Sequence, residues 1–293
     1  MSLSTSGLIN VNKPRGLSSR AVVDRVAKLV RPAKAGHAGT LDPLATGVLV
    51  VAVGAATRLI GHVQRMPKRY RGTFLLGRSS PTEDIEGDVE LLLDAPEPSR
   101  AELDVAAAKL VGSQMQRPPA FSALKLQGRP AYQLARRGQA VELAPRLIMV
   151  YQLSVARYDY PELVLDIECG GGTYVRSLGR DLAESLGTAA VMSALERTAI
   201  GSFTIEQACP FEELDGQRLA EVLLQPVAAV ADLPSVVVTS EEIVQISHAR
   251  FVHRTDLLPA DEYTAMDEAG NLVALMTPRG DGYLGAHVNF IGK

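Results

Sequence analysis

Acidic side chains are scarce at the start of this 293-residue chain: residues 1–78 hold 13 lysines and arginines against only Asp24 and Asp42. That segment carries a net charge of +11, and because the whole chain carries −3, the remainder carries −14. This asymmetry predicts one electropositive face, and such a face suits a polyanionic ligand bound in a salt-dependent way. On charge alone, a merely solvated cationic surface is the less favoured alternative and stays open.

Cysteine and long apolar runs are also scarce. The two cysteines, Cys169 and Cys209, fit neither a zinc spacing nor a disulfide framework, so we expect a reducing, cytoplasmic setting. Residues 1–7 lack the cationic start and apolar core of a signal peptide, and the longest apolar stretch, residues 48–56, is too short to span a bilayer. With 46% hydrophobic residues the chain is nevertheless long enough and apolar enough for a large globular domain plus a small one.

One stretch, residues 36–49 (GHAGTLDPLATGVL), concentrates turn-forming residues between a basic segment and an apolar one. Its three glycines and Pro43 predict a tight, shaped loop. Asp42 lies in this loop and is the only acid between Arg25 and Arg78. Composition alone leaves open that an Asp-Pro pair simply starts a turn.

The hydrophobic pattern predicts alternating strands and helices. Val22, Val26, Leu29 and Val30 recur at helical spacing behind a Ser18 or Ser19 N-cap, and Pro32 should end that helix. Ser99 with Glu102 predicts a capping box. Strands are expected at residues 8–11, 48–53, 70–76, 147–158 and 163–169, and helices at 132–137, 175–186, 189–197 and 216–229. Short strands at 236–238, 251–252, 263–266 and 272–276 predict a small β domain.

The motifs, taken together, resemble those of the bacterial tRNA pseudouridine-55 synthases. The residue 36–49 stretch resembles the family's catalytic motif over fourteen positions, and further matching segments follow in family order between residues 7 and 203. These segments are residues 13–19 (KPRGLSS), 68–70 (KRY) with Leu76-Gly77, Asp84 and Gly87, 117–125 (RPPAFSALK), 132–136 (YQLAR), 169–178 (CGGGTYVRSL) and 195–197 (LER).

The resemblance implies an α+β fold with a mixed, largely antiparallel central sheet flanked by helices. It further implies a catalytic domain over residues 1–233 and a small PUA-like β domain over residues 234–293. The implied activity is isomerisation of uridine 55 in the tRNA T loop, with no cofactor, no metal, no membrane and no required protein partner.

The resemblance also assigns site residues. It makes Asp42 the catalytic residue and Arg176 the cation that keeps it ionised, with Tyr70 stacking on a flipped uracil. Tyr174 and Leu195 would be pocket walls, and His37 would take the place of the flipped nucleotide, oriented by Asp84. Predicted RNA contacts are Lys13, Arg15, Lys34, Arg58, Lys68, Lys125 and Arg136.

Two other functions remain open at this point. A non-catalytic RNA binder or tRNA-folding chaperone would use the same cationic face, but it has no need of an isolated acid among cations. An unrelated carboxylate hydrolase would need a second acid for the leaving group, and no second acid is matched near the loop.

Overall fold

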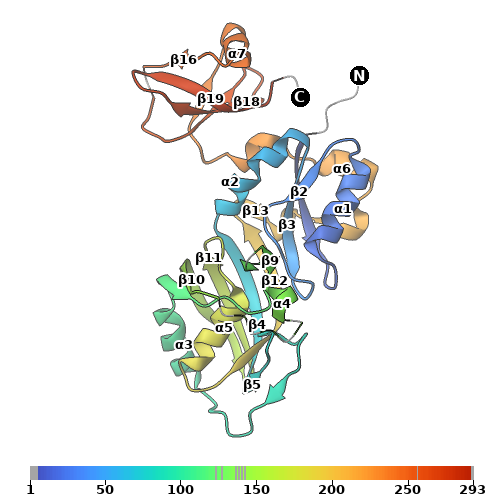
Figure 1. Cartoon of the computed structure of the whole chain (residues 1–293), viewed down its shortest axis with the longest axis vertical. Helices are drawn as coiled ribbons and strands as arrows, with labels where there is room; N and C mark the ends of the chain where they lie inside the picture. Colours follow the sequence, from blue (N-terminus) through green and yellow to red (C-terminus); the bar gives the residue numbers. More distant parts are fainter. Residues whose placement is uncertain are drawn as a thin grey trace.

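A computed structural model describes residues 6–291 except Ala123, Gln127, Arg136, Gly138, Ala140, Glu142 and Asp256. Figure 1 shows an elongated molecule in which a large sheet with its helices occupies most of the length, and a smaller sheet lies beyond one end. The smaller sheet is built only from strands that follow residue 234. The predicted α+β class is confirmed.

The large sheet contains ten strands within the described residues, in the order β14–β1–β3–β12–β4–β11–β10–β7, with β2 paired to β3 and β13 to β12. All neighbours are antiparallel except β1 with β14 and β3 with β12, so the sheet is mixed and largely antiparallel as expected. Its strands are β1 (Gly7–Lys13), β2 (Ala35–His37), β3 (Thr46–Val53), β4 (Lys68–Leu76), β7 (Gly112–Gln116), β10 (Arg146–Asp159), β11 (Glu162–Cys169), β12 (Ala190–Ile200), β13 (Phe203–Thr204) and β14 (Cys209–Pro210).

Helices cover this sheet and connect its strands (Figure 1). They are α1 (Ser19–Leu29), η1 (Gly54–Leu59), α2 (Ile60–Arg65), α3 (Arg100–Lys109), α4 (Ala131–Ala135), α5 (Val175–Glu184), η2 (Ile205–Gln207), η3 (Phe211–Glu213), α6 (Gly216–Val222) and η4 (Pro226–Ala229). Two short hairpins add β5 (Arg78–Ser79) with β6 (Glu90–Leu91) and β8 (Lys125–Leu126) with β9 (Arg129–Pro130).

The predicted caps of α1 and α3 are confirmed. Ser18 caps α1 by accepting a hydrogen bond from the Ala21 N–H, and Ser99 forms a reciprocal capping box with Glu102. The helix expected up to Pro32 ends at Leu29, and the one expected over residues 216–229 is interrupted. Between α6 and η4, Leu224 leaves the helix because its N–H and carbonyl both pair with Leu8 of β1.

Strand β3 is buried on both faces, which explains why residues 48–53 read as one apolar run. Val48, Val50 and Ala52 pack towards η1 and α2, and the residues between them pack towards α1. Strand β11 instead alternates: Leu163 and Leu165 face the core under α3 and α5, as predicted. The Asp42 loop, defined here as residues 38–45, leads directly into the buried strand β3.

The helix predicted over residues 189–197 is wrong. This segment is strand β12, paired with β4 on one side and with β3 on the other. Its Ala, Met, Leu, Glu and Arg residues favour helix locally, but pairing at the centre of the sheet outweighs that preference. The consequence matters for the site, because it places Leu195 and Arg197 on the buried side of the strand.

The smaller sheet has the strand order β15–β17–β18–β19–β16. Its elements are β15 (Ser235–Val237), α7 (Ser240–Ser247), β16 (Val252–His253), β17 (Tyr263–Met266), β18 (Leu272–Pro278) and β19 (Tyr283–Asn289). The expected short strands are present, whereas α7 and β19 were not predicted. Helix α7 carries a readable signal, a capping box between Thr239 and Glu242.

The two sheets share an apolar core. Leu272 and Leu275 of β18 pack in the same cluster as residues of β3, η1 and α2. Arg58 of η1 donates to the Asn289 carbonyl oxygen at 2.6 Å, and its guanidinium lies 4.9 Å from the centre of the Phe290 ring. The small sheet is thus attached through side chains as well as through the chain, and a domain boundary at residues 233/234 stays a prediction.

Gly179 is required where α5 crosses β4. A Cβ at this position would lie 2.1 Å from Cε1 of the Phe74 ring, which is itself fully buried. Gly179→Ala is therefore expected to lower the free energy of unfolding in urea by about 1–3 kcal/mol, although alanine is the better helix former. Gly216→Ala at the start of α6 meets nothing within 4 Å and is the matched control. Equal stability of the two variants would contradict this packing.

Candidate active site

Hydrogen bonds to the start of α1 anchor the main chain of the Asp42 loop. The Ser19 hydroxyl at the start of α1 accepts a hydrogen bond from the Leu41 N–H (2.8 Å) and donates one to the Leu41 carbonyl oxygen (3.0 Å). Gly39 adopts φ +143°, a value that favours glycine. Leu41 is buried, so the neighbouring Asp42 carboxylate projects from an anchored main chain and is 40% exposed.

A single guanidinium faces two carboxylates. Arg176 of α5 lies 3.0 Å from Asp42 Oδ2 through Nη2 and 3.1 Å from Asp84 Oδ2 through Nη1. The same side chain donates to the main-chain oxygens of Thr82 (2.6 Å) and Phe121 (3.1 Å). Asp84 is only 3% exposed, so its charge is compensated inside the protein, whereas Asp42 stands at the open end of the pair.

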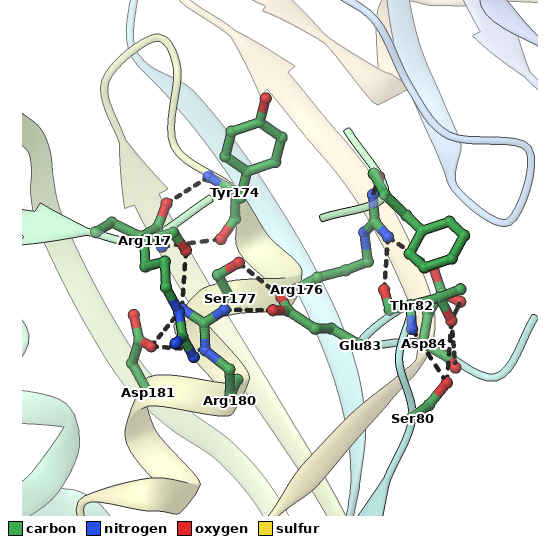
Figure 2. A network of polar contacts seen from close by, with 12 residues as sticks. Ser80, Thr82, Glu83, Asp84, Arg117, Tyr174, Arg176, Ser177, Arg180 and Asp181 are labelled. Carbon is green, nitrogen blue, oxygen red and sulfur yellow. Dashed lines mark hydrogen bonds and ion pairs between the residues drawn. The ribbon is translucent and has the colours of Figure 1, made fainter. Parts of the chain in front are cut away.

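Helix α5 presents its arginines on a fixed support, as Figure 2 shows. Tyr174 precedes the helix, and its main-chain N–H and carbonyl pair with the side-chain amide of Gln116 at 2.9 and 3.0 Å. One turn after Arg176, Arg180 binds Glu83 and donates to the Arg117 carbonyl oxygen. The two arginines therefore bind neighbouring acids of the same loop and carbonyls of the same segment after β7.

A cavity of about 490 Å³ opens beside Asp42. The predicted residues that line it together are Asp42, Lys68, Tyr70, Tyr174, Arg176 and Leu195. They come from the Asp42 loop, from β4 and β12, and from the start of α5. This volume lies within the usual range for small-molecule sites, and a pyrimidine nucleotide base fits within it. The structure thus brings the predicted carboxylate, tyrosines and arginine to one opening.

Arg197 also lines this cavity, and its position was not predicted beyond its place in the 195–197 motif. Tyr70 of β4 and Arg197 of β12 are cross-strand partners and line the same cavity. Burial raises the pKa of the Tyr70 phenol, and the positive charge of Arg197 acts against that rise. The tyrosine is therefore a neutral phenol near pH 7, with a cation beside it.

The expected pairing of Asp84 with His37 is wrong. The Asp84 carboxylate instead accepts hydrogen bonds from Thr82 Oγ1 (2.6 Å) and the Glu86 N–H (3.1 Å), in addition to its ion pair with Arg176. His37 accepts a hydrogen bond on Nδ1 from the Gly39 N–H, and burial lowers its pKa. The histidine lies where β2 leads into the Asp42 loop.

The predicted RNA-contacting cations divide into four groups. Arg15 and Lys34 are exposed near the Asp42 loop, as an RNA contact requires. Lys13 and Lys68 are buried, and their ammonium groups donate to main-chain carbonyls, so a free phosphate-binding role for them is wrong. Arg58 is engaged with the small sheet. The Lys125 side chain and Arg136 lie outside the described residues.

Lys13 gives the protein a pH dependence of known sign. Burial lowers its pKa from 10.5 to about 8. Between pH 8 and 10.5 the unfolded chain therefore binds more protons at this site than the folded chain, and stability rises with pH. We expect the urea unfolding free energy of wild type minus that of Lys13→Met to increase from pH 7.5 to pH 9.5. An unchanged difference would contradict the buried ammonium.

Comparison with known proteins places this chain in a family. The family described as "TruB family pseudouridylate synthase (N terminal domain)" matches residues 27–175. The chain is 40% identical over 288 residues to the tRNA pseudouridine synthase B of Caulobacter sp. (strain K31), covering 94% of this chain and 93% of that protein. It is 38% identical to the enzyme of the same name from Arthrobacter sp. (strain FB24), covering 94% of both. The chain belongs to the TruB family.

Solved structures agree on the fold of this TruB-family chain. An H/ACA RNP bound to a substrate RNA containing 2′-deoxyuridine holds a chain with a TM-score of 0.72 and 23% identity, covering 94% of this chain and 78% of that one. A Cbf5-Nop10-Gar1 complex gives a TM-score of 0.69 and 26% identity, covering 93% and 78%. The likeness extends across both sheets, since it covers nearly the whole chain.

Within the described residues, no group of three or more His, Cys, Asp or Glu side chains is placed to hold a metal ion. The helices of the described part of the chain are also too short or too polar to cross a membrane.

Proposed function

We propose that this TruB-family protein isomerises uridine 55 in the T loop of tRNA to pseudouridine. The observation that carries the proposal is Asp42, which stands at the mouth of a base-sized cavity with its carboxylate 3.0 Å from Arg176. The family match and the relatives named tRNA pseudouridine synthase B support the reaction and the substrate.

The cavity supports recognition of a base that has left the helical stack. A stacked uridine cannot place its base in the cavity and its sugar C1′ beside Asp42, so the nucleotide must be flipped out. Tyr70 provides an aromatic face, and Tyr174 and Leu195 provide walls on either side. Enclosure by these side chains keeps water away from the cleaved intermediate, which would otherwise yield an abasic site.

Asp42 acts on the sugar in this proposal. Cleavage of the N1–C1′ bond releases uracil as a resonance-stabilised anion, so one carboxylate is sufficient. Asp42 either adds to C1′ or removes a sugar proton, and both routes need an ionised carboxylate. Arg176 places a positive charge 3.0 Å from that carboxylate.

The uracil then turns within the pocket and rejoins C1′ through C5. The C5 proton must leave for the solvent, and the Tyr70 phenol in the pocket can relay it by giving up its own hydrogen as it takes the C5 proton. All heavy atoms of the product come from the substrate, and the protons lost and gained are exchanged with water. We therefore propose that the reaction requires no cofactor and no metal.

Cations around the opening support binding of a tRNA stem-loop. Arg15, Arg20 and Lys34 are exposed on the segments that flank the Asp42 loop. Contacts of this kind position the phosphate backbone and make affinity fall with salt. We assign the smaller sheet a PUA-like RNA-binding role, with tRNA as the partner in the cytoplasm.

The test is conversion of an unmodified tRNA transcript by the purified protein, followed as tritium release from uridine labelled at C5. We expect release of one equivalent per transcript and none from a transcript with cytidine at position 55. Release from the cytidine-55 transcript, or no release from either, would contradict the proposal.

The hydrolase alternative can be judged from Asp84. This second carboxylate does lie near Asp42, but it is buried behind Arg176 and bonded to Thr82 and Glu86. It is not free to protonate a leaving group, as a glycosidase acid must. Free uracil among the products would favour the hydrolase, and tight tRNA binding without product would favour a non-catalytic chaperone.

A further inference from the structure

The group that this inference concerns is Arg197, a charged side chain that is only 1% exposed. Burial of a charge is costly unless another charge compensates it, and buried arginines normally pair with a carboxylate. Within the described residues Arg197 forms no ion pair; the nearby acids Asp42 and Asp84 are both engaged by Arg176. Arg197 instead directs its donors at neutral oxygens.

These oxygens belong to the Asp42 loop and to β3. The Nε of Arg197 donates to the Val48 carbonyl oxygen at 2.7 Å, and Nη2 donates to the Gly39 carbonyl oxygen at 3.1 Å. Nη1 lies 3.5 Å from the Thr40 carbonyl oxygen, two residues before Asp42. Tyr70 of β4 is the cross-strand partner of Arg197 and lines the same cavity. One planar guanidinium therefore joins the Asp42 loop to β3 beside Tyr70.

The main chain of Arg197 also lies against the end of the Asp42 loop. Arg197 pairs with Gly47 in the parallel contact between β12 and β3. A Cβ on Gly47 would lie 2.3 Å from the Arg197 carbonyl oxygen, and Gly47 has φ +99°. The strand that carries the guanidinium therefore lies in close main-chain contact with the residues that leave the Asp42 loop.

The chemistry of the contact with Tyr70 has a direction. A guanidinium has only donors, so Arg197, the cross-strand partner of Tyr70, can donate to the phenol oxygen and leave the phenol hydrogen for another partner. Because Tyr70 lines the cavity, a base bound there is the partner that we assign to this hydrogen. Buried donors aimed at an oxygen that gains negative charge are also an efficient form of electrostatic stabilisation.

We propose that Arg197 is a positioning residue that links the Asp42 loop to Tyr70 and turns the Tyr70 hydroxyl into the cavity. The proposal rests on the proposed pseudouridine synthase function, since it assigns a part in that reaction. Arg197 does not touch the reacting atoms; it acts through Asp42 and Tyr70.

The experiment compares Arg197→Lys and Arg197→Met with wild type in single-turnover tritium release from the tRNA transcript. We expect Arg197→Lys to lower the rate constant about 10²-fold, because it keeps the charge but loses the fork that aligns the two groups. The dissociation constant for tRNA should stay within about twofold. Arg71→Lys, on β4 beside Tyr70 but exposed and paired with Asp166, is the control and should match wild type.

The pH profile separates positioning from mere support of the fold. Loss of the cation raises the pKa of Tyr70 further, so the alkaline limb of the rate profile should move to higher pH in Arg197→Met. In a Tyr70→Phe background, Arg197→Lys should cost less than it does in wild type, because one of its two targets is gone.

Folded Arg197 variants that keep the wild-type rate constant would overturn the proposal, as would full additivity with Tyr70→Phe. If neither Arg197 variant folds, Tyr70→Phe alone decides: the proposal requires it to lose the alkaline limb, and an unchanged limb would overturn it. Wild-type release in the same assay shows whether the proposed function itself holds, so the two failures are distinguishable.

Discussion

Asp42→Asn is expected to reduce pseudouridine formation by about 10⁴-fold or more while leaving tRNA binding within a few-fold of wild type. The substitution keeps the size and the anchoring of the loop, since Leu41 still bonds Ser19. It removes the negative charge and the nucleophilic oxygen that both proposed routes need. Single-turnover tritium release and filter binding to the same transcript measure the two quantities.

Asp24→Asn is the matched control for this variant, because Asp24 is the other acid of the first 78 residues. It lies on α1 in an exposed pair with Arg20 and faces no cavity. We expect wild-type turnover from it. Full turnover by Asp42→Asn would remove the proposed mechanism, whereas a parallel loss of binding would shift Asp42 to a role in RNA recognition.

Arg176→Met is expected to abolish turnover and to lower the free energy of unfolding by about 3–5 kcal/mol. Removal of one partner from a buried ion pair leaves the other uncompensated, and Asp84 is almost fully buried. The same change deletes the hydrogen bonds to Thr82 and Phe121. Urea unfolding and single-turnover rates check the two effects separately.

A second substitution separates stability from catalysis. Arg176→Met with Asp84→Asn removes the buried charge as well and should regain part of the stability, but no activity, because Asp42 still lacks its cation. Arg180→Met on the same helix should lose stability through Glu83 yet retain the rate constant, since Arg180 does not face Asp42. Restored turnover in the double variant would show that Arg176 serves only the fold.

The central residues of the site were predictable because each lies in a short sequence motif. Asp42, Tyr70 and Arg176 were assigned from motifs, and the fold brings them to one cavity. The capping residues and the buried strand β3 were predictable for a related reason: capping and continuous burial depend on neighbours along the chain. Such features can be read without knowing which strands pair.

The predictions that were wrong concern residues whose structure depends on contacts between segments far apart in the sequence. Residues 189–197 are good helix formers, and only pairing with β3 and β4 makes them a strand, so the inward direction of Arg197 was hidden. Lys13 looks like any surface cation until β1 is buried around it. The acid beside Arg176 was given the wrong partner because proximity between residues 84 and 176 is set by tertiary packing.

The segment that follows β7 and the carboxylate of Asp42 share one partner. Arg176 donates to the Phe121 carbonyl oxygen with the same nitrogen that faces Asp42. One turn further along α5, Arg180 donates to the Arg117 carbonyl oxygen (Figure 2). Any displacement of this segment by a docking macromolecule therefore stretches a bond to the guanidinium that steadies the reactive acid. Movement of the segment after β7 would therefore shift the Arg176 guanidinium beside Asp42 directly.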